Sequence, residues 1–272
     1  MPLFEACCML VIAITLAALA RAQGWRTTLA DYAPLAAAAW VGEETCIGWY
    51  RYYRYAEGWH GHLLDVPVLV PLIWPLVILS ARQVVRAMWP GRMEALLVGA
   101  AVAFDASLVE VLSVRAGMWS WAEPGHLSVP LIGILGWGYF AAAASWMLGA
   151  PGWRRRAAML VVAPAITHAA ILLSWWGLFR WTLRGELGSS SLIGLAFVSG
   201  GVTAAVLSAR TKGHAMTLQT ALPRLAATTL FVVMFLTTAA RVTALWVHLG
   251  CVAVPYLAAM SLRARRSPAI RA

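Results

Sequence analysis

The chain consists of apolar runs, each about as long as a helix needs to cross a bilayer. About 20 helical residues span the roughly 30 Å hydrocarbon core. Short polar segments separate these runs, which lie near residues 3–20, 29–48, 64–81, 94–115, 127–148, 157–176, 190–208, 222–240 and 243–262. This pattern predicts an all-α, polytopic membrane bundle of about nine transmembrane helices. The last two runs flank Arg241 and also fit one broken helix, which makes eight spans the alternative.

Composition agrees with this pattern and argues against a soluble core. The chain has 272 residues, of which 61% are hydrophobic and 12% charged, and its mean hydropathy is +0.74. We see no linker long or polar enough to divide it, so we expect one transmembrane domain over 1–262 and a short Arg-rich cytoplasmic tail over 263–272. The stretch Ala20-Arg21-Ala22 resembles a signal-peptide cleavage site, but the segment before the first run contains Glu5 and no basic residue, so we expect a retained span.

The charge balance bears on topology. Basic residues number 21 against 11 acidic ones, a formal charge of +10. They lie in short loops between apolar runs, where they set orientation and face anionic lipid, so we expect no nucleic-acid partner. An outside N-terminus puts 15 of the 21 on the cytoplasmic side. The positive-inside rule therefore predicts an N-out, C-in protein, multi-pass in a bacterial inner membrane.

The sequence gives no sign of a bound cofactor or metal. The sequence contains no phosphate-binding loop, dinucleotide fingerprint or HExxH motif. It also lacks the histidine clusters of membrane di-iron desaturases, and its four cysteines form no CxxC. We therefore expect neither a cofactor nor a metal.

Carboxylic acids inside the apolar runs are the strongest functional signal. Acids in a membrane cost several kcal/mol unless paired, hydrated or protonated. Asp105 and Glu110 lie in the run 94–115, about 140° apart around a helix. Either they face different neighbours, or both line one wide cavity, and a structural pair with an arginine such as Arg115 is the alternative. Glu44, near the outer end of the second run, is a further candidate, whereas we interpret its neighbour Glu43 as structural.

Aromatic residues cluster around a break that follows the run 94–115. After Gly117 come Trp119 and Trp121, and Trp137 follows in the next apolar run. Two interpretations fit these rings equally well. They form either an interfacial aromatic belt or the wall of a site that stabilises a carbocation through the π faces of its rings. We add Trp40 and Tyr53 as candidate substrate contacts, although headgroup anchoring is the favoured interpretation for the tyrosine stretch.

Two passages within roughly residues 40–148 form a recognisable pattern when taken together. The first contains Glu44-x3-Gly48, Tyr50, Tyr53, Tyr55, Leu64, Val66-Pro67, Pro71-Leu72 and Trp74, and the second contains Asp105, Glu110, Gly117-x-Trp119-x-Trp121, Val129-Pro130-Leu131 and Gly136-Trp137. Their order and spacing resemble the family of integral-membrane carotenoid biosynthesis proteins. This family includes bacterial carotenoid 1,2-hydratases and the archaeal bacterioruberin-pathway hydratase.

The chain differs from the family pattern at two places. Val111 follows Glu110 where the pattern has proline, and Gly133-Ile134 stand where it has Asn-Phe. A divergent member acting on another polyene, or at another step, fits these differences. The resemblance implies a membrane enzyme of carotenoid or isoprenoid biosynthesis.

The residues suit acid-catalysed hydration of a terminal carotenoid double bond. A carboxyl group in an apolar setting is readily protonated, because burial disfavours its charged form, and it can act as general acid. We expect Glu110 or Asp105 to be that acid and Glu44 to handle the water. Trp119, Trp121 and Trp137 would surround the cation. The substrate, a lipophilic polyene, would enter from the bilayer, and the enzyme would be a cofactor-independent hydratase, a hydro-lyase.

Other functions remain open from the sequence. A membrane terpene or carotenoid cyclase would use the same acid and rings while excluding water. A non-enzymatic transporter or carotenoid-binding protein would use the acids as a proton or substrate path, although paired broken helices would be expected there and the sequence has one clear break. The pattern specifies neither the polyene nor the oligomeric state.

Overall fold

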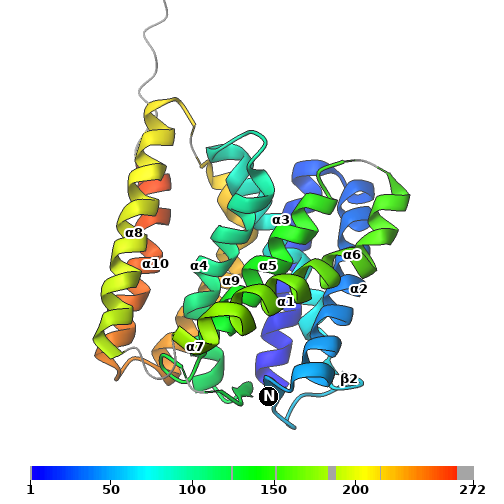
Figure 1. Cartoon of the computed structure of the whole chain (residues 1–272). Helices are drawn as coiled ribbons and strands as arrows, with labels where there is room; N and C mark the ends of the chain where they lie inside the picture. Colours follow the sequence, from blue (N-terminus) through cyan, green and yellow to red (C-terminus); the bar gives the residue numbers. More distant parts are fainter. Residues whose placement is uncertain (1, 124, 151, 183–187, 215, 262–272) are drawn as a thin grey trace, which may run out of the picture.

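The computed structural model describes residues 2–123, 125–150, 152–182, 188–214 and 216–261, and within these ranges the chain is a bundle of helices (Figure 1). The sixth apolar run forms one continuous helical segment, in which α6 passes through a π-helical segment, η1, into α7. The helices are α1 (Pro2–Gln23), α2 (Trp25–Tyr50), α3 (Leu69–Met88), α4 (Glu94–Arg115), α5 (Leu131–Met147), α6 (Trp153–Ile171), η1 (Leu172–Phe179), α7 (Arg180–Thr182), α8 (Gly188–Thr211), α9 (Leu218–Thr238) and α10 (Thr243–Ser261).

The predicted all-α membrane bundle is confirmed. Each of the nine apolar runs contains one long helix in the described part of the chain, and a turn at 239–242 separates α9 from α10. Seven of the described helices are long and apolar enough to cross a membrane by length and composition. The other two are α2, which contains Asp31, Glu43 and Glu44, and α5, which is apolar but has 17 residues.

The helices form a main bundle and an outlying pair. In the main bundle α2 packs on α3 and α6, α5 packs on α4 and α6, and α9 packs on α1, α3 and α4. In Figure 1, α8 and α10 run side by side at one edge of the molecule, and α10 also contacts α4. The break between α4 and α5 lies at the lower end of the main bundle in Figure 1, where Met118 belongs to the same hydrophobic cluster as Phe4 of α1.

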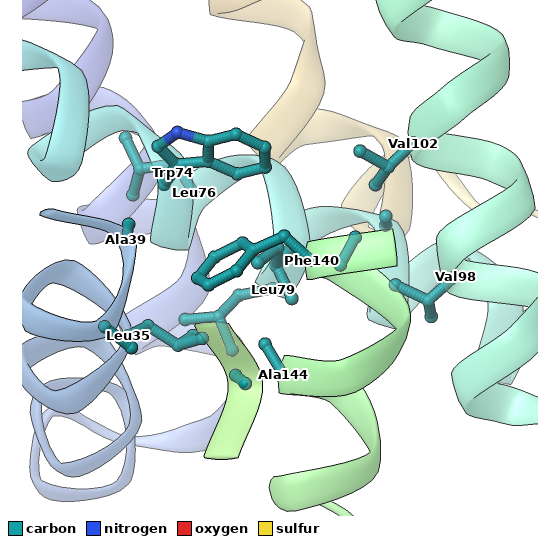
Figure 2. Packing of buried hydrophobic residues seen from close by; sticks show 14 of the residues in the cluster. Leu35, Ala39, Trp74, Leu76, Leu79, Val98, Val102, Phe140 and Ala144 are labelled. Carbon is teal, nitrogen blue, oxygen red and sulfur yellow. The ribbon is translucent and has the colours of Figure 1, made fainter. Parts of the chain in front are cut away.

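A hydrophobic core joins α2, α3, α4 and α5 in the main bundle. Figure 2 shows Phe140 of α5 between Leu35 of α2 and Val98 of α4, and all three side chains are buried. Trp74 of α3 meets the Phe140 ring edge-on, with 5.0 Å between ring centroids. This core thus fixes the position of Trp74, whose indole nitrogen faces away from it toward a polar site.

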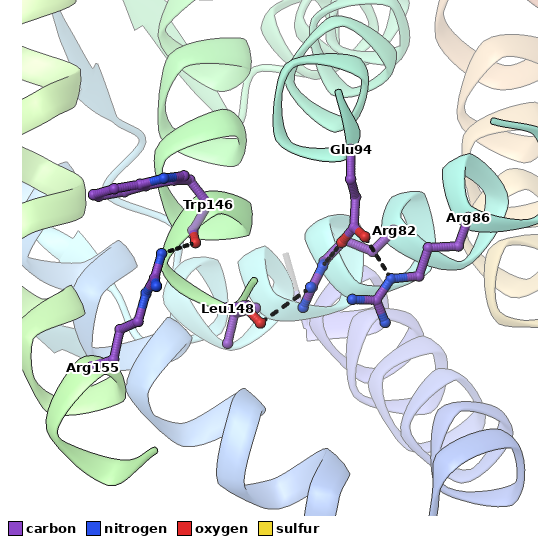
Figure 3. Close-up of polar contacts among 6 residues, drawn as sticks. All are labelled: Arg82, Arg86, Glu94, Trp146, Leu148 and Arg155. Atoms are coloured by element: carbon purple, nitrogen blue, oxygen red, sulfur yellow. Dashed lines mark hydrogen bonds and ion pairs between the residues drawn. The ribbon is translucent and has the colours of Figure 1, made fainter. Parts of the chain in front are cut away.

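Arginines tie together the helix ends on the side away from this polar site. Figure 3 shows Arg82 and Arg86 of α3 on the carboxylate of Glu94, each through Nε at 2.8 Å. Arg82 also donates to the carbonyl oxygen of Leu148, and Arg155 donates to that of Trp146. Arginines that we assigned to the cytoplasmic side therefore also connect α3, α4, α5 and α6. The orientation of the bundle stays a prediction, and the tail over 263–272 lies outside the described residues.

Small residues let α4 and α5 approach closely. A Cβ atom added at Gly99 would lie 2.7 Å from both the Ala142 Cβ and the Gly138 carbonyl oxygen. Contacts of this kind commonly hold helices together in membranes, where apolar burial between helices gives little net gain. α4 carries Asp105 and Glu110, and α5 carries Trp137, so this close contact sets the shape of the site.

Replacing Gly99 by leucine is expected to destabilise the bundle. The new side chain would meet backbone as well as the Ala142 side chain, and overpacking of this kind costs about 1–3 kcal/mol. We expect a lower thermal midpoint in detergent, measured by size-exclusion chromatography after heating. Gly48→Ala is the control, because nothing lies within 4 Å of its added Cβ. Equal stability of Gly99→Leu and the wild-type protein would contradict the close contact.

Candidate active site

Four short strands outside the helices form two pairs, and one of these pairs arranges the aromatic residues of the site. β1 (Tyr53–Tyr55) pairs antiparallel with β4 (Trp119–Trp121), and β2 (His62–Leu63) pairs with β3 (Val66–Pro67). Tyr53 lies opposite Trp121, and Tyr55 lies opposite Trp119. Side chains alternate between the faces of a strand, so these four rings share one face, and Arg54 and Ser120 point away from it. The apolar pattern did not predict this small sheet.

Glu110 is held by three indole groups. Its side chain is almost fully buried in α4. Trp119 and Trp121 donate their Nε1–H groups to Oε2 at 2.9 and 3.0 Å, and Trp137 donates to Oε1 at 2.6 Å. Hydrogen bonds to the charged form of a carboxyl group stabilise that form. The three indoles therefore offset part of the cost of burying this group.

Glu43 of α2 has a matching set of three donors. Trp74 donates its indole N–H to Oε1 at 2.7 Å, Tyr55 donates its hydroxyl to Oε2 at 2.8 Å, and the Tyr53 hydroxyl donates to the same oxygen. Burial raises the pKa of Tyr53 and of Tyr55 well above the usual phenol value, and the adjacent Glu43 acts in the same direction. Both phenols therefore stay protonated and keep donating.

The two carboxyl groups belong to one site, because their aromatic partners touch. The rings of Trp74 and Trp137 lie 4.3 Å apart, and those of Tyr53 and Trp121 lie 4.8 Å apart. Each contact joins a partner of Glu43 to a partner of Glu110. We call Glu43, Glu110 and their six donors the acid–aromatic cluster.

A cavity of about 440 Å³ runs beside the acid–aromatic cluster, a volume typical of small-molecule sites. Both carboxyl groups and all six donors line it. Residues of α9 and α10 complete its wall, and four of these have exposed side chains: Leu225, Val232, Leu257 and Met260. The cavity therefore extends from the acids to α9 and α10.

Asp105 also lines the cavity but has different partners. Arg224 of α9 forms an ion pair with its Oδ2 atom, and the Tyr256 hydroxyl of α10 donates to Oδ1 at 2.7 Å. The two acids of α4 thus face one wide cavity, which is the second of the two arrangements considered above. The arginine partner of Asp105 is Arg224, within α9, in place of Arg115 at the end of α4.

Two candidates lie away from this cavity. Glu44 accepts a hydrogen bond from the backbone N–H of Asp65 at 3.2 Å, and Trp40 donates to the carbonyl oxygen of Leu63 at 3.1 Å. Neither residue lines the cavity. The structure therefore brings together Glu110, Asp105, Trp119, Trp121, Trp137 and Tyr53 from our candidates and leaves Glu44 and Trp40 at the loop over 62–65.

A comparison with protein families bears directly on this site. The model of the family described as carotenoid biosynthesis protein matches residues 3–186, about two thirds of the chain. The chain belongs to the carotenoid biosynthesis protein family. No curated protein and no solved structure matches it. The protein is thus a multi-pass membrane protein with a role in carotenoid biosynthesis.

The matched part of this carotenoid biosynthesis protein contains the complete acid–aromatic cluster. Glu43, Glu110 and their donors all lie between residues 43 and 137. Arg224 and Tyr256 lie beyond the matched residues. Among the described residues, no group of three His, Cys, Asp or Glu side chains is arranged to hold a metal ion.

Glu43, which we interpreted as structural, lines the cavity, as do Trp74 and Tyr55, which were not among our candidates. A signal for Glu43 exists, since Ala39, Gly42, Glu43 and Cys46 follow helical spacing and all line the cavity. Glu43 thus shares a face with small residues, whereas Glu44 lies next to that face. Trp74 and Tyr55 belong to the passages that resemble the family, and this membership could have indicated them as site residues.

Gly133 provides room for Trp121 in this carotenoid biosynthesis protein. A Cβ at this position would lie 2.6 Å from the indole ring of Trp121. The glycine is one of the two departures from the family pattern noted above. Its absent side chain lets Trp121 pack against α5 while it donates to Glu110.

We expect Gly133→Ala to displace the Trp121 ring and to lower thermal stability. The added methyl group breaks the packing or the hydrogen bond to Glu110, at a cost of about 1–3 kcal/mol. Thermal unfolding of the purified protein in detergent measures the change. Gly136→Ala, one turn along α5, is the matched control, because nothing lies within 4 Å of its added Cβ. A similar midpoint for both variants would contradict the close contact at Gly133.

Proposed function

We propose that the protein hydrates a terminal carbon–carbon double bond of a carotenoid through a carbocation. The observation that supports this proposal most is a buried carboxyl group, Glu110, surrounded by three indoles beside a cavity that also contains a second carboxyl group, Glu43. Membership of the carotenoid biosynthesis family supports the substrate class. The hydration step itself is our inference from the site.

Protonation of the alkene is the first step. Protonated Glu110 gives its proton to the less substituted alkene carbon. The π electron pair forms the new C–H bond, and a tertiary cation remains on the other carbon. The indole N–H groups of Trp119, Trp121 and Trp137 then stabilise the carboxylate that the transfer leaves behind.

The aromatic walls of the cavity suit the cation that follows. Aromatic π faces attract positive charge, and this attraction reaches about 2 kcal/mol or more in a desolvated site. The rings of Trp121, Trp137 and Trp74 lie together along the cavity wall. A cation formed beside Glu110 would therefore lie next to these faces.

Water addition completes the reaction, and we assign the base to Glu43. A water oxygen forms the C–O bond with its lone pair, and one of its protons passes to the Glu43 carboxylate. Proton return from Glu43 to Glu110 through water restores the starting state. The sum is alkene plus water giving a tertiary alcohol. Glu44 lies outside the cavity, so Glu43 replaces it in this role.

The position of the cavity supports substrate entry from the bilayer. The cavity is lined by exposed apolar side chains of α9 and α10, namely Leu225, Val232, Leu257 and Met260. A polyene longer than the cavity would extend past these apolar residues into lipid. A bacterial inner membrane, where such substrates dissolve, is the proposed location.

Glu110→Gln is expected to abolish hydration, because the amide cannot supply the proton. General acid catalysis contributes about 10²–10⁴-fold to a rate. The variant is co-expressed with enzymes that supply lycopene or γ-carotene in a colourless bacterium, and the masses of the extracted pigments are measured by mass spectrometry. The wild-type protein should give a pigment heavier than its precursor by one water molecule. An isomer of unchanged mass would indicate a cyclase, and unaltered pigment from every precursor would contradict the proposal.

Glu43→Gln and Glu44→Gln form a matched pair that tests the base. Adjacent residues carry the same change, but only Glu43 faces the cavity. We expect Glu43→Gln to lower product formation by about 10²-fold or more. Glu44→Gln should keep most of the activity, with expression of both variants checked by immunoblot. Loss of activity in Glu44→Gln alone would return the role of base to Glu44.

A further inference from the structure

A second polar group lies in the cavity, away from the acid–aromatic cluster. It consists of Asp105 from α4, Arg224 from α9 and Tyr256 from α10, and all three line the cavity. Asp105 precedes Glu110 by five residues, which places it about 7.5 Å away along the α4 axis. The hydration step proposed above uses none of these three residues.

One hydrogen-bond donor of this group, on the Arg224 guanidinium, has no partner within the group. Arg224 uses Nη2 for Oδ2 of Asp105, and the Tyr256 hydroxyl occupies Oδ1. The Arg224 Nη1 atom is buried and has no hydrogen-bond partner among the described residues. A buried donor without a partner is costly, and a charged one especially so. An acceptor from outside the chain would remove this cost.

We propose that Arg224 binds an oxygen atom of the substrate, so that the preferred substrate is an oxygenated polyene. This inference rests on the proposed function and specifies its substrate class. The acceptor is a neutral oxygen, a hydroxyl or carbonyl group, because Asp105 already balances the guanidinium charge. A phosphate or carboxylate would bring an unbalanced negative charge into an apolar cavity.

The surroundings of Arg224 agree with such a substrate. Leu225, Ala253 and Leu257 line the same part of the cavity and suit a hydrocarbon chain. The separation along α4 puts the oxygen several bonds from the reacting double bond. One end of the polyene would react beside Glu110 while the oxygen further along the chain is held by Arg224.

Specificity and chemistry would then come from different parts of the chain. Glu43 and Glu110 lie within residues 3–186, which match the family model, and Arg224 and Tyr256 lie beyond them. Asp105 connects the two parts, because it belongs to α4 and binds both α9 and α10. Changes in α9 and α10 would therefore alter which polyene is accepted without altering the acid–aromatic cluster.

The test is a direct binding measurement on the purified full chain in detergent. Three acyclic polyenes of equal chain length are titrated: a hydrocarbon, its hydroxyl derivative and its carbonyl derivative. Pigment that elutes with the protein is measured by absorbance. We expect one of the oxygenated polyenes to bind about 10–100-fold more tightly than the hydrocarbon, the range given by one hydrogen bond to a charged group.

Three variants assign this preference to the Nη1 atom. Arg224→Lys keeps the charge facing Asp105 and removes the second nitrogen, so it should lose the preference and bind the hydrocarbon like the wild type. Tyr256→Phe keeps the ring beside the Arg224 guanidinium and removes only the hydroxyl, so it should keep the preference. Arg156→Lys is the control, since its ion pair with Asp31 lies outside the cavity.

Two results would overturn the proposal, and they differ from each other. Equal binding of all three polyenes by the wild type, or an unchanged preference in Arg224→Lys, would refute oxygen recognition by Arg224 but not the proposed hydration. A water molecule bound to Nη1 would then satisfy this donor. Binding of no polyene by the wild type would refute the proposed function as well.

Discussion

The structure depends on the burial of two carboxyl groups in an apolar bundle. An unpaired charge in such a place is very costly, so each group must find donors inside the protein. Glu43 and Glu110 find them in indole and phenol groups, which are apolar everywhere except at one atom. Aromatic donors therefore satisfy the acids and keep the surrounding surface apolar. A site built in this way can hold both a proton donor and a hydrocarbon.

This requirement explains why a small β-sheet exists in an otherwise helical protein. Helices alone place side chains about 100° apart, whereas paired strands put alternate residues of both chains on one face. The pairing of β1 with β4 brings two phenols and two indoles to the same place. The end of α4 before Gly117 is thus required to form the strand β4, which holds Trp119 and Trp121 in the site. It also fixes the direction in which α5 begins, and hence the position of Trp137.

The bundle treats its other charged groups differently. Asp105 with Arg224, and Asp31 with Arg156, form ion pairs between helices distant in sequence. Such pairs hold helices in register, but a carboxylate bound to a guanidinium is a poor proton donor. The acid–aromatic cluster contains no cation among its hydrogen-bond partners in the described residues. Partners without charge are compatible with the proton transfers proposed for Glu43 and Glu110.

The sequence determined the fold class and much of the site. Apolar runs of membrane length specify helices, because lipid leaves the backbone no other partner. The acids and tryptophans within or beside those runs made Glu110, Asp105, Trp119, Trp121 and Trp137 candidates, and all five line the same cavity. Tertiary structure alone decided between neighbours such as Glu43 and Glu44, since a rotation of 100° separates the cavity from the loop. It alone paired Asp105 with Arg224, 119 residues away, because contacts between helices depend on how they pack and leave no periodic trace in the sequence.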